Sequence, residues 1–175
     1  SHKLKKMFLI GNLTASILAV LPFFGILMYY KNFYSVIFAH AFFLFLLIFI
    51  RELIKDLENI EGDLVADYKT IPVVFGDNKA KTIISTLAAV TLIPVYLLVE
   101  IYDIGYMDIY FYLSLAALLF FVLKLWKSTT KADYLKLHFL LKFIIVSGVF
   151  CIVLIEPAVL IHGKTVILTH SLSIY

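Results

Sequence analysis

Charged residues are scarce in this chain, and they are unevenly distributed. Asp, Glu, Lys and Arg make up 15% of the residues, and the net charge of +3 is too small to indicate a nucleic-acid partner. Residues 7–30 and 32–50 contain no charge at all. A helix needs about 20 apolar residues to cross the roughly 30 Å hydrocarbon layer of a membrane. The uncharged runs therefore predict membrane-spanning segments.

Cysteine is almost absent too. The single cysteine, Cys151, excludes a disulfide within the chain, and its place in an apolar run indicates packing rather than chemistry. The first apolar run has no clear small-residue cleavage pattern behind it and is longer than the apolar core of a signal peptide. We therefore expect it to be a retained helix.

Long apolar stretches dominate what remains, with 63% hydrophobic residues and a mean hydropathy of +1.01. They are too long and too uniformly apolar for barrel strands, and an open sheet would leave backbone groups unpaired in lipid. The fold class predicted is an all-α integral membrane protein with about five transmembrane helices. We expect one membrane domain over residues 1–175, with spans at about 7–30, 33–51, 80–100, 106–126 and 134–161.

The basic residues of the connections fall mostly on one side of this arrangement. With successive connections assigned to alternate sides, only Lys31 and Lys164 lie opposite the rest, and the connection between the third and fourth spans has no Lys or Arg. Lys and Arg mark the cytoplasmic side. We therefore expect a multi-pass protein of the cell membrane, with the N-terminus and the connection 52–77 in the cytoplasm and the C-terminus outside.

Seven of the twelve acidic residues lie in the connection 52–77, and they are Glu52, Asp56, Glu58, Glu61, Asp63, Asp67 and Asp77. Four acids and one amide recur at steps of four, three, four and four residues, a spacing that puts side chains on one face of a continuous helix. These are Glu52, Asp56, Asn59, Asp63 and Asp67. Stacked like charges repel one another, and a divalent cation would relieve that repulsion.

The residue types in this connection suit a hard ion and a diphosphate. Oxygen ligands without nearby cysteine or histidine favour Mg²⁺, which bridges a few carboxylates to substrate phosphates. Arg51, Lys55 and Lys69 lie among the acids, and their side chains would bind the remaining phosphate oxygens. The alternative is a solvated loop in which acids and lysines pair as ordinary surface charge.

The order of these residues resembles the second aspartate-rich motif of the UbiA superfamily of membrane prenyltransferases. The stretch RELIKDLENIEGDLVADYKTIPVVFG, residues 51–76, is similar to R-E-x-x-K-D-x-E-D-x-E-G-D-x-x-x-G-x-K-T-x-P-x-x-x-G. The matching residues are Arg51, Glu52, Lys55, Asp56, Glu58, Glu61, Gly62, Asp63, Lys69, Thr70, Pro72 and Gly76. Asn59 replaces a frequent Asp, Leu64 a frequent Arg, and Asp67 the usual Gly.

The resemblance extends to residues 3–6 and 11–12, which are similar to the family's basic loop and its entry into the fifth helix. It implies that the chain corresponds to helices five to nine of a nine-helix fold, as a C-terminal fragment of a longer protein. The family's first motif, N-D-x-x-D-x-x-x-D, does not occur in this sequence. We expect a missing N-terminal half to supply it.

The resemblance also implies an enzyme, a prenyltransferase that moves a polyprenyl group from a prenyl diphosphate donor to a lipid or aromatic acceptor with Mg²⁺ as cofactor. The catalytic residues implied are Asp63, Asn59 and Asp56, and the implied metal ligands are Asn59, Asp63, Asp56 and Asp67. The residues implied to bind the diphosphate are Arg51, Lys55, Lys69 and Lys5. Membrane lipid is a further partner, and the isolated chain is expected to be incomplete for activity.

The acceptor stays open between branches of the family. R-E-x-x-K-D with K-T-x-P is similar to the branch that prenylates geranylgeranylglyceryl phosphate for ether lipids. The quinone branches, which act on 4-hydroxybenzoate or dihydroxynaphthoate, remain alternatives. A different class, a cation-binding membrane transporter, would place acids within the spans, whereas the acids here cluster outside them. A truncated, inactive relative is a third alternative.

Overall fold

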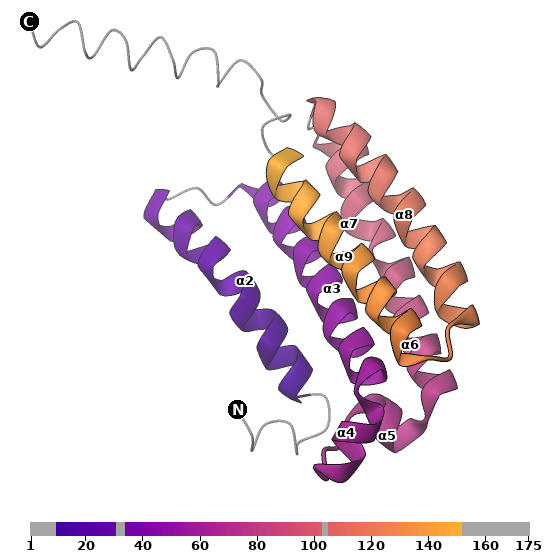
Figure 1. Ribbon diagram of the computed structural model, residues 1–175. Coiled ribbons are helices and arrows are strands. Elements are labelled where there is room, and N and C mark those ends of the chain that lie inside the picture. Colours follow the sequence, from indigo (N-terminus) through magenta and orange to yellow (C-terminus); the bar gives the residue numbers. More distant parts are fainter. Residues whose placement is uncertain (1–9, 31–33, 103–104, 152–175) are drawn as a thin grey trace, which may run out of the picture.

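A computed structural model describes residues 10–30, 34–102 and 105–151 of the chain (Figure 1). In these ranges every regular element is a helix, which confirms the predicted all-α class. The elements are α2 (Ile10–Tyr30), α3 (Ser35–Glu58), α4 (Ile60–Val65), α5 (Ile71–Phe75), α6 (Asp77–Val90), α7 (Leu92–Tyr96), the π-helical turn η1 (Leu97–Ile101), the 3-10 turn η2 (Gly105–Met107), α8 (Asp108–Lys127) and α9 (Lys131–Cys151).

Four helical segments in the described ranges are long and apolar enough to cross a membrane, namely α3, Asp77–Ile101, α8 and α9. The protein is therefore a multi-pass membrane protein. Helix α2, Ile10–Tyr30, lies within the first predicted span at about 7–30. The count of five spans stays a prediction.

Helix α3 is the centre of the bundle and packs against α2, α6 and α9 (Figure 1). Its fully buried side chains include Leu47, Ile50 and Ile54. They belong to one core cluster with Ile84 of α6 and Leu141 of α9. Lipid tails are as apolar as leucine, so close packing rather than escape from water holds such helices together.

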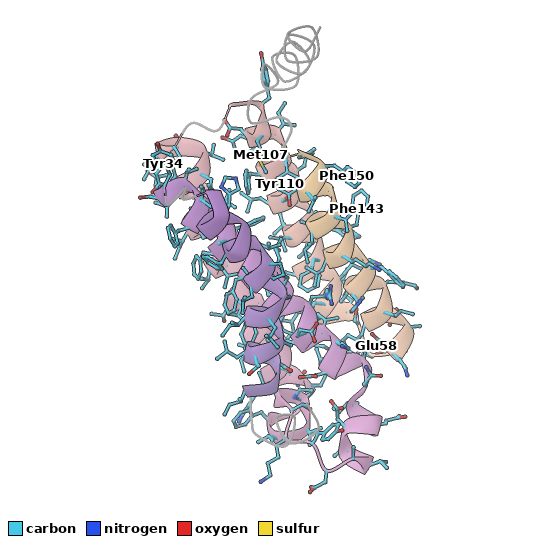
Figure 2. The ribbon with its side chains drawn as sticks, turned by 90° about the vertical axis from the view of Figure 1, so that its left-hand side faces the viewer. Tyr34, Glu58, Met107, Tyr110, Phe143 and Phe150 are labelled. Atoms are coloured by element: carbon cyan, nitrogen blue, oxygen red, sulfur yellow. The ribbon has the colours of Figure 1, made fainter. Side chains whose placement is uncertain are left out.

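The outer faces of the bundle are apolar as well. Phe143 and Phe150 of α9 are 70% and 76% exposed and point away from the bundle (Figure 2). Exposed aromatic side chains of this size would be unfavourable in water and are the expected lipid contacts of a membrane helix.

The third predicted span, at about 80–100, is a broken helix. Helix α6 ends at Val90, and the hydroxyl of Thr91 turns back to donate to the carbonyl of Ala88 at 2.6 Å. Pro94 lies three residues further on and has no N–H to donate to the carbonyl of residue 90. The segment then continues as α7 and the π-helical turn η1. The proline thus accounts for the interruption, because sharp kinks in long helices usually occur at a proline or at another identifiable feature of the sequence.

Gly148 of α9 makes room for Tyr110 of α8. The Tyr110 hydroxyl donates to the carbonyl of Ile144 at 2.9 Å, and a Cβ on Gly148 would lie 2.5 Å from that hydroxyl oxygen. We expect Gly148→Ala to displace Tyr110 and to lower stability by about 1–3 kcal/mol, the usual cost of overpacking. Thermal unfolding in detergent micelles measures the loss.

Gly25→Ala in α2 is the matched control, because nothing lies within 4 Å of its added Cβ. This variant should unfold at the wild-type temperature or above it, since alanine favours a helix interior over glycine. An unchanged unfolding temperature for Gly148→Ala would contradict the assigned close contact.

The two ends of the bundle differ in character. Helices α4 and α5 and the connection between α8 and α9 lie at one end, which we call the motif end (Figure 1). Glu58 lies toward this end, whereas Tyr34 and Met107 lie toward the other (Figure 2). The acid-rich segment is therefore gathered at one end of the apolar bundle.

Candidate metal and diphosphate site

The connection 52–77, expected as a cytoplasmic loop, is mostly helical. Helix α3 runs on to Glu58, so Glu52 and Asp56 are carried by a membrane-length helix. Asn59, with φ −112° and ψ 21°, interrupts the helix before α4. The acidic row therefore does not lie on one continuous helix. Its spacing would put the side chains on one face only if the helix were continuous.

Asp56 and Asp63 are the buried acids of the segment, each only 5% exposed. The carboxylate of Asp56 accepts a hydrogen bond from Nδ2 of Asn12 in α2 at 2.5 Å. Asp63 lies in the first turn of α4, and its backbone N–H donates to the carbonyl of Asn59 at 2.9 Å. Burying a carboxylate is costly unless it is hydrogen-bonded, paired or bound to a metal. The structure therefore singles out these two acids from their exposed neighbours.

Asn59 faces a polar cavity of about 470 Å³ between the α3–α4 junction and helices α6 and α9. Its Nδ2 donates to the carbonyl of Lys55 at 3.0 Å, which leaves the amide oxygen as the atom able to bind a cation. The cavity is also lined by Glu58, Asp77 and Tyr134. The side chain of Asn59 is thus shared between its own helix and this cavity.

Asp67 lies beyond the end of α4, in the left-handed region at φ 54°. The backbone N–H of Tyr68 donates to the carbonyl of Asp63 at 2.9 Å, and that of Asp67 donates to the carbonyl of Leu64 at 3.2 Å. This pair of bonds is the Schellman arrangement, in which glycine is the preferred left-handed residue. Asp67 is exposed and does not continue the helical row, so its role as a metal ligand stays a prediction.

The basic candidates are arranged around Glu52. Nη2 of Arg51 lies 3.2 Å from one carboxylate oxygen of Glu52, and Nζ of Lys55 lies 3.6 Å from the other. Nε of Arg51 is buried and has no hydrogen-bond partner among the described residues. Glu52 therefore orients two cations, a role that its place in the acidic row does not predict.

Arg51 and the buried Asp56 do not share one side of α3. Arg51 and Asp56 are five residues apart, which turns their side chains by about 140° around the helix axis. Lys69 is exposed just before α5. Lys5 lies outside the described residues. The structure thus brings Arg51 and Lys55 together around Glu52.

The candidate ligands are of the types that magnesium prefers, but Asp56 and Asp63 do not line the cavity that Asn59 faces. In the described ranges no three His, Cys, Asp or Glu side chains are grouped so that they could hold a metal ion. Mg²⁺, however, is commonly bound by one or two carboxylates, with water and substrate phosphate oxygens as the other ligands. Asp56 and Asp63, with the amide oxygen of Asn59, are hard oxygen donors of this kind.

A buried lysine binds Asp77, one of the residues that line the cavity. Lys81 of α6 is 3% exposed, and its Nζ lies 2.6 Å from a carboxylate oxygen of Asp77 and donates to the carbonyl of Ser128 at 2.7 Å. The hydroxyl of Tyr134 in α9 donates to the same Asp77 at 2.7 Å. The spacing of Asp77 and Lys81 indicates a helical pair, but only the tertiary structure shows that the lysine is buried, whereas the side chain of Asp77 is 41% exposed.

Comparison with known proteins decides the family. The sequence pattern of the UbiA prenyltransferase family matches residues 1–144, which include the whole of the acid-rich segment. The chain belongs to the UbiA prenyltransferase family. The resemblance inferred from residues 51–76 is therefore confirmed.

Curated relatives of this UbiA-family chain carry one name. It is 38% identical over 112 residues to a digeranylgeranylglyceryl phosphate synthase of Methanosphaera stadtmanae, covering 62% of the chain and 40% of the relative. It is 30% identical over 130 residues to the protein of that name from Methanobrevibacter smithii, covering 69% of the chain and 43% of the relative. It is 33% identical over 109 residues to the one from Pyrococcus furiosus, covering 61% of the chain and 39% of the relative. The chain thus spans about two fifths of their length. No solved structure matches it significantly.

Proposed function

We propose that this chain is the diphosphate-binding part of a Mg²⁺-dependent membrane prenyltransferase. One observation carries the proposal: Asp56 and Asp63, the two aspartates of the motif that match the family pattern, are also its two buried acids. A surface loop with ordinary charge pairing would leave both carboxylates in water. Their burial at the end of membrane-length helices instead suits a site that excludes water.

Each described side chain takes one role in this proposal. Asp56, Asp63 and the amide oxygen of Asn59 hold Mg²⁺, which when bound supplies Lewis-acid stabilisation of the diphosphate leaving group. Arg51 and Lys55 are held by Glu52 and bind diphosphate oxygens, Arg51 as a planar fork and Lys55 as a point charge. Their positive charge stabilises the negative charge that develops as the diphosphate leaves.

The proposed acceptor is geranylgeranylglyceryl phosphate. The names of the curated relatives favour this lipid acceptor over the aromatic acceptors of the quinone branches. The prenyl group would pass from a geranylgeranyl diphosphate donor to the free hydroxyl of the glyceryl lipid, which loses its proton as the new ether bond forms.

The test is prenyl transfer in a reconstituted membrane. The chain is placed in proteoliposomes, alone and with an N-terminal half containing the first aspartate-rich motif, and incubated with labelled geranylgeranyl diphosphate, geranylgeranylglyceryl phosphate and Mg²⁺. We expect a labelled lipid with two prenyl chains in the combined sample and none after chelation of Mg²⁺. Transfer only to 4-hydroxybenzoate or dihydroxynaphthoate would overturn the acceptor. Ion uptake into the liposomes without any transfer would favour a transporter.

The sidedness proposed for the protein is testable by labelling. The Lys and Arg residues near helix ends in the described ranges, among them Lys79, Lys124 and Lys131, lie on segments at the motif end, which supports a cytoplasmic location for that end. With Cys151 replaced by Ser, we expect an impermeant maleimide added from the cytoplasmic side to label Thr129→Cys, between α8 and α9, and not Ser173→Cys. Cytoplasmic labelling of Ser173→Cys would contradict the predicted outside C-terminus.

A further inference from the structure

Asn12 connects α2 to the acid-rich segment. Its Nδ2 donates to Oδ2 of Asp56 at 2.5 Å, between residues 44 positions apart in the sequence. An ionised carboxylate can accept hydrogen bonds but cannot donate them, so the amide group of Asn12 must present its N–H. Hydrogen bonds to an ionised group are stronger than those between neutral groups.

The other polar side chains near Asn12 on α2 bond differently. The hydroxyl of Thr14 donates to the carbonyl of Ile10 at 2.6 Å, and that of Ser16 donates to the carbonyl of Asn12 at 2.8 Å. Both bonds stay within α2, where they satisfy hydroxyl groups on an apolar helix. Asn12 instead reaches a neighbouring helix, so its amide serves a tertiary contact.

A further contact between α2 and α3 among the described residues is apolar and lies away from the motif end. Val20 of α2 packs with Ala41 and Ile48 of α3 in a small cluster. These side chains hold the two helices together, but they give no direction to the carboxylate of Asp56. The hydrogen bond from Asn12 supplies that direction.

We propose that Asn12 is a positioning residue that aims the carboxylate of Asp56 at the metal ion. This inference rests on the proposed function. A neutral amide suits the task, because it fixes one oxygen of Asp56 without cancelling the negative charge that attracts the cation. A lysine at this place would neutralise Asp56 and compete with the metal. Partners of metal-ligating side chains typically contribute about 10–100-fold to metal affinity.

The test compares metal binding with and without this hydrogen bond. The chain is combined with the same N-terminal half as in the transfer assay and titrated with Mn²⁺ in the presence of geranylgeranyl diphosphate. Free Mn²⁺ is followed by electron paramagnetic resonance. We expect Asn12→Leu, which keeps the side-chain size, to weaken Mn²⁺ binding by roughly tenfold or more. Thr14→Val is the matched control and should bind Mn²⁺ like the wild type, because its bond lies within α2.

Kinetics distinguish positioning from structural damage. In Asn12→Leu the transfer rate should reach half its maximum at a higher Mg²⁺ concentration and approach the wild-type rate at saturation, whereas a damaged fold would lower the rate at every concentration. Asn12→Leu should have no further effect in an Asp56→Asn background, because coupled residues are not additive. If Asn12→Leu does not fold, Asn12→Gln is the second variant, because it retains the amide. It should bind Mn²⁺ more tightly than Asn12→Leu and less tightly than the wild type.

The possible outcomes separate the two hypotheses. Wild-type Mn²⁺ affinity in Asn12→Leu would overturn the positioning role and leave the proposed function standing. A wild-type protein that neither binds Mn²⁺ nor transfers a prenyl group would overturn the proposed function, and the positioning role with it.

Discussion

Asp63→Asn is expected to reduce prenyl transfer at saturating substrate by about a hundredfold or more, the range seen when one electrostatic group is removed from a preorganised site. The substitution keeps the size and burial of the side chain and removes its charge. Asp63 is 5% exposed in the first turn of α4, so bulk water cannot compensate for that loss. Initial rates of labelled product formation in proteoliposomes, over a range of Mg²⁺ concentrations, measure the effect.

Glu61→Gln is the matched control for this substitution. Glu61 lies on the same short helix, two residues earlier, and is exposed. Removing its charge should leave the rate near that of the wild type. Undiminished transfer in Asp63→Asn would contradict the metal assignment of Asp63, and an equal loss in both variants would show that α4 responds to any change of charge.

Lys81→Met is expected to lower the free energy of unfolding by about 1.5–3 kcal/mol, because it removes two hydrogen bonds made by a buried charged group. The side chain of Asp77 is 41% exposed, so water compensates part of the loss. Nζ of Lys81 binds Asp77 at 2.6 Å and the carbonyl of Ser128 at 2.7 Å. Together with the hydroxyl of Tyr134 these groups join α6 to α9 and to the connection before it. Thermal unfolding in detergent micelles measures the loss.

Lys79→Met is the control for Lys81→Met, because Lys79 is an exposed lysine on the same helix. It should change stability little, since exposed charges contribute little. The double variant Lys81→Met with Asp77→Leu should recover part of the loss, because the carboxylate of Asp77 then no longer lacks its cation. A Lys81→Met protein as stable as Lys79→Met would contradict the contacts assigned to the buried Nζ of Lys81.

The apolar spans were predictable from the sequence because lipid limits the choices of the backbone. Every N–H and C=O in the hydrocarbon layer needs a partner, and a helix provides one locally. The uncharged run 32–50 therefore predicts a helix wherever it packs, and α3 is that helix. Its end was less predictable, since α3 continues through Glu52 and Asp56 to Glu58.

The family was predictable for a different reason. Residues 51–76 combine acids, bases and a Lys-Thr-Ile-Pro sequence in an order that ordinary surface charge does not require. The match of residues 1–144 to the family confirms it. The spacing of three and four residues was a poorer guide to which acids lie together, because it places side chains on one face only in a continuous helix. Asn59 breaks that helix, and Asp67 adopts a left-handed backbone beyond α4.

The sequence by itself thus determined the all-α membrane class and the family, because both depend on composition and local order. Only the tertiary structure decided which acids are buried and that Asn12 bonds Asp56. The physical reason is that contacts between helices depend on how each helix is rotated against its neighbours. That rotation follows from packing over the whole bundle rather than from the residues of one segment.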